Sequence, residues 1–125
     1  YVYEQQDDRN GVFGEVHEEG SLNQVFQAQT IGGVGSGLYS HVVSNQFGEN
    51  NFADVDQNGE LGSGETHQHG DDNEAWIDQE GNENIGYIMQ EGMINMASIS
   101  QMGNMHNANI HQNGDSNSAS ITQNQ

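Results

Sequence analysis

The stretch "NEAWIDQEGNENIGYIMQEGMINMASISQMG", residues 73–103, contains three successive copies of one pattern. Each copy has Asn, a small residue, Ile, Gln and Gly at alternate positions, and two free residues separate one copy from the next. The copies therefore recur with a period of eleven, and their alternation is typical of a β-strand with one buried face. The glycine supplies the positive φ that a tight turn requires. The stretch predicts a series of short strands joined by turns.

The same pattern runs from residue 46 to the end of the chain, and it defines the predicted core and turns. The glutamines are Gln46, Gln57, Gln68, Gln79, Gln90, Gln101, Gln112 and Gln123. The turn glycines follow two residues later at Gly48, Gly59, Gly70, Gly81, Gly92, Gly103 and Gly114. The β-branched residues two before the glutamines are Val55, Thr66, Ile77, Ile88, Ile99, Ile110 and Ile121. Asparagines six before are Asn51, Asn73, Asn84, Asn95 and Asn117.

The recurrence explains how amides can occupy an interior position. A single strand cannot bury its apolar face, but stacked copies can, which is the physical basis of a solenoid. An isolated buried amide is costly, whereas a column of amides can hydrogen bond along the stack. We therefore predict that the glutamines form such columns along the stack.

Residues 40–125 resemble the curlin family, the amyloid subunits of bacterial curli fibres. Ser40, Gln46, Asn51 and Gln57 match the family repeat S-x5-Q-x4-N-x5-Q in full, and Asn84 begins another copy with Asn in place of Ser. Gly62 and His106 depart from the repeat at that first position.

The resemblance implies an all-β fold, a β-solenoid of stacked 22-residue strand-turn-strand repeats that assembles into a cross-β amyloid fibril. The two strands per layer that it implies place one set of glutamines on one sheet, Gln57, Gln79, Gln101 and Gln123, and the other set on the opposite sheet, Gln46, Gln68, Gln90 and Gln112. It further implies secretion to the bacterial cell surface and roles in adhesion and biofilm matrix, without enzymatic activity or a cofactor. The implied partners are other copies of the chain, a nucleator subunit and a dedicated outer-membrane secretion apparatus.

We predict repeats at 40–61, 62–83, 84–105 and 106–125, preceded by an N-terminal segment at 1–17 and a degenerate glycine-rich repeat at 18–39. Two upstream registers remain open. One places Gln24 in phase with Gln46, one full layer earlier, with Gly35 in a glutamine position. The other aligns Gly14, Val16, Glu18, Gly20 and Asn23 with the small, β-branched, glutamine, glycine and asparagine positions, and it requires an insertion near 30–39.

The chain is strongly acidic, and its charge limits the possible partners. There are 19 Asp and Glu residues against one basic residue, Arg9, and of these only Glu83, Glu91 and Asp115 follow residue 80. This balance argues against nucleic acid and anionic membrane partners, and no apolar span is long enough for insertion into a membrane. Residues 22 apart would stack about 4.8 Å apart, so Asp56 would repel Asp78. We therefore expect low pH or divalent cations to speed assembly.

A rival interpretation comes from "DVDQNGELGSGE", residues 54–65, which fits the EF-hand loop pattern through Asp54, Asp56 and Glu65. The flanking sequence has strand and turn character, whereas an EF-hand needs two helices. An acidic calcium-binding β-roll is the alternative class, but it repeats every nine residues. An ice-binding solenoid would need outward arrays of threonine. Calcium remains a weak hypothesis, and we predict no metal site.

His67 and His69 share one strand face, which invites a metal interpretation, but no ligand set with metal spacing completes it. No pocket is predicted around the carboxylates or serines, so catalysis is not expected. The outward aromatic residues Phe52, Trp76 and Tyr87 have two interpretations. They serve either as contacts between protofilaments or with the N-terminal segment, or as a ligand-binding surface.

Overall fold

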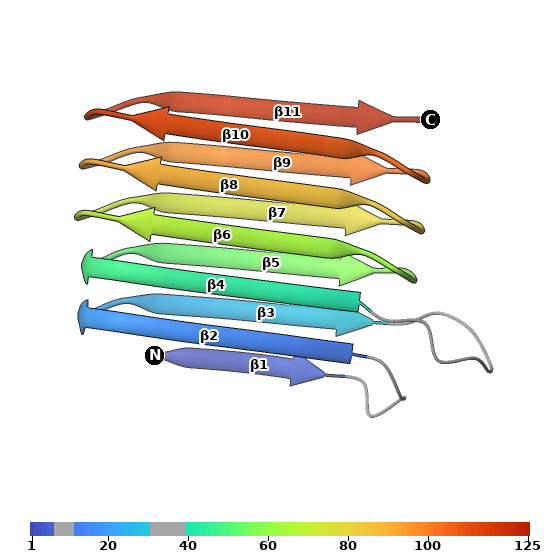
Figure 1. Cartoon of the computed structure of the whole chain (residues 1–125), viewed down its shortest axis with the longest axis horizontal. Helices are drawn as coiled ribbons and strands as arrows, with labels where there is room; N and C mark the ends of the chain where they lie inside the picture. Colours follow the sequence, from blue (N-terminus) through green and yellow to red (C-terminus); the bar gives the residue numbers. More distant parts are fainter. Residues whose placement is uncertain (7–11, 31–39) are drawn as a thin grey trace.

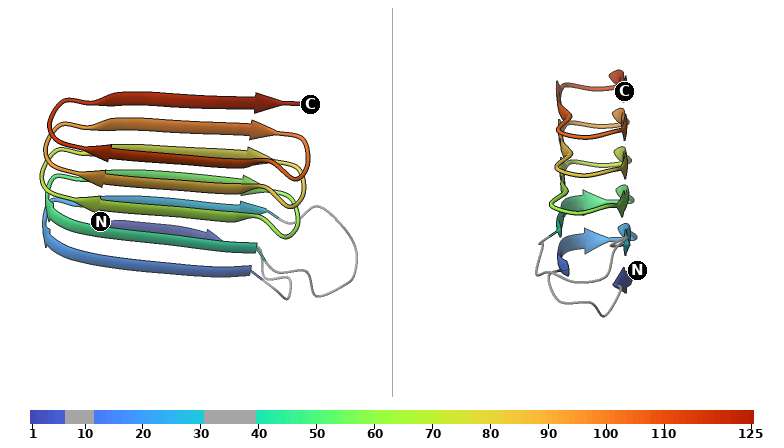
Figure 2. Two further views of the ribbon diagram at one scale, coloured as in Figure 1. Left: turned by 45° about the horizontal axis from the view of Figure 1, so that its top comes forward. Right: turned by 90° about the vertical axis from the view of Figure 1, so that its right-hand side faces the viewer.

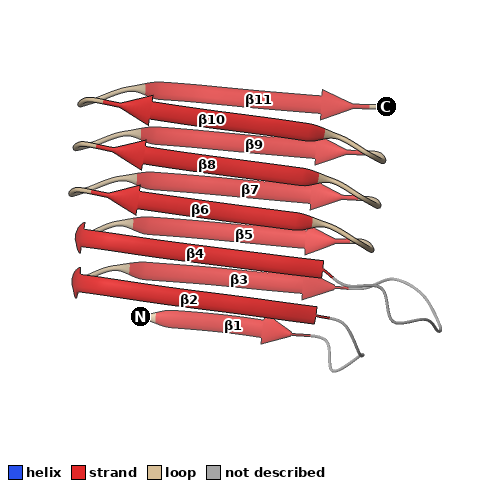
Figure 3. Cartoon of the chain, viewed as in Figure 1, coloured by secondary structure: helices blue, strands red, loops and turns tan. Residues whose placement is uncertain are grey.

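A computed structural model of the chain describes residues 1–6, 12–30 and 40–125. All regular secondary structure within these residues is β-strand, and the strands stack in one solenoid (Figures 1 and 3). This confirms the predicted all-β solenoid. In the part of the chain described, no helix is long and apolar enough to cross a membrane.

The chain alternates between two parallel sheets, so two strands and two turns make one layer (Figure 2). The first sheet contains, in order, β1 (Val2–Gln6), β3 (Gln24–Thr30), β5 (Phe52–Asn58), β7 (Glu74–Glu80), β9 (Met96–Met102) and β11 (Ser118–Asn124). The second contains β2 (Val12–Ser21), β4 (Ser40–Glu49), β6 (Ser63–His69), β8 (Ile85–Glu91) and β10 (Asn107–Asn113). Each strand pairs only with members of its own sheet.

The strand register from β4 onward follows the predicted 22-residue layer. Val55 pairs with Ile77, Ile77 with Ile99, and Ile99 with Ile121. Identical positions of the repeat therefore lie directly above one another along the stack. This in-register stacking turns each repeated residue type into a continuous column.

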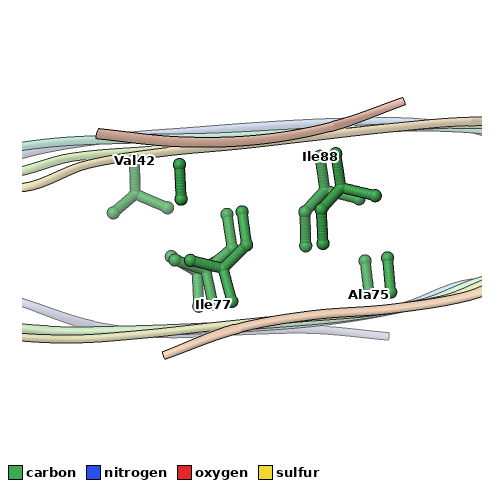
Figure 4. Close-up of a cluster of buried hydrophobic side chains, with 9 residues drawn as sticks. Val42, Ala75, Ile77 and Ile88 are labelled. Carbon is green, nitrogen blue, oxygen red and sulfur yellow. The ribbon is translucent and has the colours of Figure 1, made fainter. Parts of the chain in front are cut away.

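The apolar core lies between the two sheets. Val42 and Ile88 project from the second sheet toward Ala75 and Ile77, which project from the first (Figure 4). Ile77, Ile88 and Ile99 are at most 1% exposed. Burying one such side chain contributes roughly 1.5–3 kcal/mol, so each added layer extends a core that no single repeat could form.

Each turn from Gly48 onward contains two residues with positive φ, and the sequence pattern identified only the glycine. The second lies two residues later and is not glycine: Asn50, Leu61, Asp72, Glu83, Ile94, Met105 and Ser116 have φ of 56–59°. The glycine is required for space as well as for conformation. A Cβ built on Gly81 would lie 2.0 Å from the carbonyl oxygen of Gly103 in the next layer.

The N-terminal strands follow the second of the two predicted registers, so the first is wrong. Glu18 pairs with Gln46, a wider spacing in sequence than the later layers have, whereas Gln24 pairs with Phe52 in the other sheet. The reason is local: Gly20, with φ of 123°, and Leu22, with φ of 60°, reproduce the two positive-φ positions of the later turns. The predicted boundary at 17/18 lies within β2. Gly35 and the rest of residues 31–39 in the predicted glycine-rich repeat fall outside the described residues.

Candidate functional site

The buried glutamines form two hydrogen-bonded columns, one in each sheet. In the first sheet, the Gln57 Nε2 donates to Gln79 Oε1 at 2.7 Å, Gln79 to Gln101 at 2.7 Å, and Gln101 to Gln123 at 2.9 Å. In the second sheet, the bonds from Gln46 to Gln68, Gln68 to Gln90 and Gln90 to Gln112 measure 2.8, 3.0 and 2.9 Å. Each column therefore links successive layers of its sheet through side chains alone.

The columns have a direction that the backbone sets. Each glutamine Nε2 also donates to a main-chain carbonyl, as Gln68 does to Phe52 at 2.8 Å and Gln101 to Ile85 at 3.0 Å. These carbonyls hold each amide nitrogen toward the C-terminal neighbour. Gln57 Nε2 has a weaker contact with the His41 carbonyl, at 3.4 Å. If the oxygen and nitrogen of the Gln57 side-chain amide were exchanged, the oxygen would accept from the Gly64 N–H. That reversal would bring the side-chain oxygens of Gln57 and Gln79 within 2.7 Å of each other, which favours the donating orientation.

The asparagines work differently from the glutamines, because they bond to the backbone of the next layer. Asn73 Oδ1 accepts from the Asn95 N–H at 3.1 Å, and Asn73 Nδ2 donates to the Gly92 carbonyl at 2.9 Å. Asn95 repeats this arrangement with Asn117 and Gly114. Asn51, Asn73, Asn84 and Asn95 are buried, whereas Asn117, in the last layer, is partly exposed. The asparagines thus tie consecutive turns together.

Both ends of the described stack leave bonding groups unused. At the C-terminal end, β10 and β11 each have one sheet neighbour, and the Gln112 and Gln123 amides have no glutamine beyond them. The core-facing Ile121 and Gln123 of β11 are only partly buried, unlike their counterparts in inner layers. Toward the N-terminus, Glu18 occupies the glutamine position, and the buried Gln46 Oε1 lacks a hydrogen-bond partner. An edge of this kind is a template for another strand.

Carboxylates on the outer face of the first sheet stack as predicted. Asp56 pairs in register with Asp78, and Asp54 with Trp76. Burial and repulsion from Asp78 raise the pKa of the Asp56 carboxyl above its usual value. Burial, followed by repulsion from Asp56 and Asp78, raises the pKa of Asp54. The negative charge of these layers therefore opposes close stacking.

The calcium-loop interpretation does not fit this geometry. Asp54 lies on β5 in the first sheet, whereas Glu65 lies on β6 in the second, so the two carboxylates cannot meet at one ion. His67 stacks in register between Asn45 and Met89, and its Nδ1 lies 3.1 Å from Asn45 Nδ2. His69 lies between Phe47 and Glu91 in the neighbouring column. No group of three His, Cys, Asp or Glu side chains among the described residues could hold a metal ion.

A parallel two-sheet solenoid with continuous amide columns and open edges defines a structural repeat protein that can extend by stacking. Two regions of the chain, residues 70–103 and 95–124, match the family model described as the curlin associated repeat. The chain is therefore a curlin-repeat protein, as its resemblance to the family predicted. Neither a curated protein nor a solved structure matches it significantly. Curlins are structural proteins rather than enzymes.

Proposed function

We propose that this chain is the subunit of an extracellular functional amyloid fibre of the curli type. The observation that carries the proposal is the C-terminal edge of the described stack, where β10 and β11 each have one sheet neighbour and continue the glutamine columns of the inner layers. The solenoid fold and the curlin repeats support the same function. In this proposal the core columns of residues 40–125 form the fibre spine.

Growth proceeds by templated addition. An incoming chain pairs a strand with β11 and another with β10, because each edge offers one row of free N–H and C=O groups. The amide nitrogens of Gln112 and Gln123 face the acceptor oxygens of the new layer, and this continues the direction of the columns. Ile121 becomes buried in the process, which adds hydrophobic stabilisation.

Electron microscopy of the purified chain at micromolar concentration tests the proposal directly. We expect unbranched fibres whose diffraction shows a meridional spacing of about 4.8 Å, the separation of strands in a sheet. A chain that stays monomeric under these conditions, while its circular dichroism reports β-structure, would contradict fibre formation but leave the solenoid intact. Calcium-dependent folding of such a monomer would favour the β-roll alternative.

We also propose, from the family, that the fibre is displayed on a bacterial surface, where it serves adhesion and biofilm matrix. A nucleator subunit and a dedicated outer-membrane secretion apparatus are the partners that this role requires. Immunogold labelling of intact cells expressing the chain tests the location. Gold particles on extracellular fibres are expected, and labelling confined to the cell interior would contradict the proposal.

A further inference from the structure

The outer face of the first sheet carries an aromatic stack that crosses β3, β5 and β7 and continues to Tyr1, whose ring centroid lies 6.3 Å from that of Phe26. Phe26 on β3, Phe52 on β5 and Trp76 on β7 have ring centroids 5.7 and 5.8 Å apart, with interplanar angles of 42° and 48°. Such tilted packing gives a continuous aromatic surface. Neither of the two C-terminal layers repeats it, because serines occupy the Trp76 column at Ser98 and Ser120.

Asp54 lies within this aromatic surface. It pairs in register with Phe26 on one side and Trp76 on the other, and Phe52 precedes it by two residues on the same strand face. Three rings therefore border one carboxylate. We call the surface formed by Phe26, Phe52, Asp54 and Trp76 the Asp54 face.

The Asp54 carboxylate is charged without compensation. It is partly buried, and it makes neither a hydrogen bond nor an ion pair within the described residues. Burial and the neighbouring charges of Asp56 and Asp78 raise its pKa, which shows that the protein destabilises its ionised form. Residues 1–6, 12–30 and 40–125 contain no Lys or Arg, and the Tyr1 ammonium among them lies 3.8 Å from Glu18 Oε2 and donates to the Asn23 carbonyl. A cation brought from outside would relieve this destabilisation.

The chemistry of the face selects among organic cations. A guanidinium group is flat, so it can lie against ring faces on an open sheet, and it donates two parallel hydrogen bonds to a carboxylate. A lysine ammonium is a strongly hydrated point charge with no flat face to stack. A quaternary ammonium has no N–H group to donate to Asp54. The acidic surroundings, within a chain of net charge −18, favour a basic macromolecular partner.

We propose that the Asp54 face binds the guanidinium group of an arginine side chain from another polypeptide. The guanidinium stacks on Trp76 and Phe52 while it donates to the Asp54 carboxylate. The site requires only the solenoid fold and does not depend on fibre formation. It gives the N-terminal layers a binding role that the serine-lined C-terminal layers lack.

Trp76 is the single tryptophan of the chain, so its fluorescence reports on this site alone. The full chain is titrated with a glycine peptide containing two arginines, with its lysine counterpart, and with a citrulline counterpart that keeps the shape but loses the charge. We expect a saturable change with the arginine peptide, weaker binding of the lysine peptide, and citrulline binding at least about tenfold weaker. Equal binding of arginine and citrulline peptides would overturn the proposal.

Two variants with the same change in charge separate a site from general attraction. Asp54→Ser should weaken binding about tenfold, and serine fits because Ser98 and Ser120 occupy the same column. Glu65→Ser, on the opposite sheet, should change it less than about twofold. Equal losses in the two variants would mean that only net charge matters, and the proposal would fail. Electron microscopy of the same samples reports fibre formation separately.

The Arg9→Gln variant tests whether the chain fills the face itself. We expect its fluorescence and its affinity for the arginine peptide to match those of the unchanged chain. If removing Arg9 alters Trp76 fluorescence and tightens peptide binding, the chain's own arginine is the occupant, and the proposal of an external partner is overturned.

Discussion

Two glycines with the same backbone angle but different surroundings allow the cost of layer stacking to be measured. Gly81 and Gly114 both have φ of 110°. A Cβ on Gly81 would lie 2.0 Å from the Gly103 carbonyl oxygen, whereas on Gly114 its nearest contact is Asn117 Nδ2 at 3.5 Å. The difference arises because Gly114 lies in the last turn of its column. Gly81→Ala and Gly114→Ala therefore share the conformational strain and differ in the clash.

The expected magnitude follows from the contacts. Non-bonded atoms need roughly 3.5 Å, so Gly81→Ala must open the gap to the next turn by about 1.5 Å. That movement breaks the bonds from Gly103 N to Glu80 O and from Met105 N to Asn82 O, each 2.9 Å long. Two lost hydrogen bonds at about 1 kcal/mol each, with backbone strain of about 1–3 kcal/mol, give about 3–5 kcal/mol for Gly81→Ala. Gly114→Ala should cost only the strain.

Urea unfolding of freshly prepared monomer, followed by Trp76 fluorescence, gives the two free energies. Under the proposed mechanism Gly114→Ala should also fail to elongate seeds of the unchanged chain, because a new layer would meet its added methyl group. Equal destabilisation by the two substitutions would refute the assignment of Gly81 to close layer contact. Normal elongation by Gly114→Ala would refute addition at the C-terminal edge.

Three further predictions concern the amide column, the acidic face and the turns. Replacing Gln101 and Gln123 together by Ala should slow seeded elongation several-fold, because buried hydrogen-bond partners are left unsatisfied. Met102→Ala, at an exposed position, should not slow it. An unchanged elongation rate in the double variant would count against the glutamine column. Because the pKa of Asp54 is raised, the folded chain binds protons more tightly than the unfolded chain, so its contribution to stability is fully present below the usual value of 3.8 and is lost as pH rises through the raised pKa. The urea concentration at the unfolding midpoint should therefore decrease as pH rises from 4 to 7, and the decrease should be smaller in Asp54→Ser. A midpoint that increases with pH in both proteins would contradict this. Ile94→Asn should stabilise the chain by about 1 kcal/mol, because a β-branched residue at φ of 58° is strained and Asn tolerates that conformation. The control Ile85→Asn, within β8, should not stabilise it.

The repeat by itself determined the strands and the columns of glutamine and isoleucine, and the resemblance to the curlin family added the assignment of the strands to two sheets. The reason is that each 11-residue unit ends in a turn that carries the chain to the opposite sheet, so each position returns to the same face of the same sheet after every second repeat. Even the outward stacking of Asp56 on Asp78 follows from this arithmetic. The glutamine columns could be predicted because their hydrogen bonds join identical positions of the repeat.

Only the tertiary structure decided the features that depend on how turns and layers meet. The asparagines bond to main-chain groups 19 and 22 residues away, and those groups approach them only once two turns are stacked. The register of β2 depended on the turn at Gly20 and Leu22, where non-glycine residues with positive φ leave no mark in the sequence pattern. The environment of Asp54 likewise depends on three layers. Phe26 pairs with Asp54 although the two are separated by more residues than one 22-residue layer, so the repeat could not predict this contact. Sequence periodicity specifies what recurs within a layer, whereas long-range packing decides where unlike residues meet.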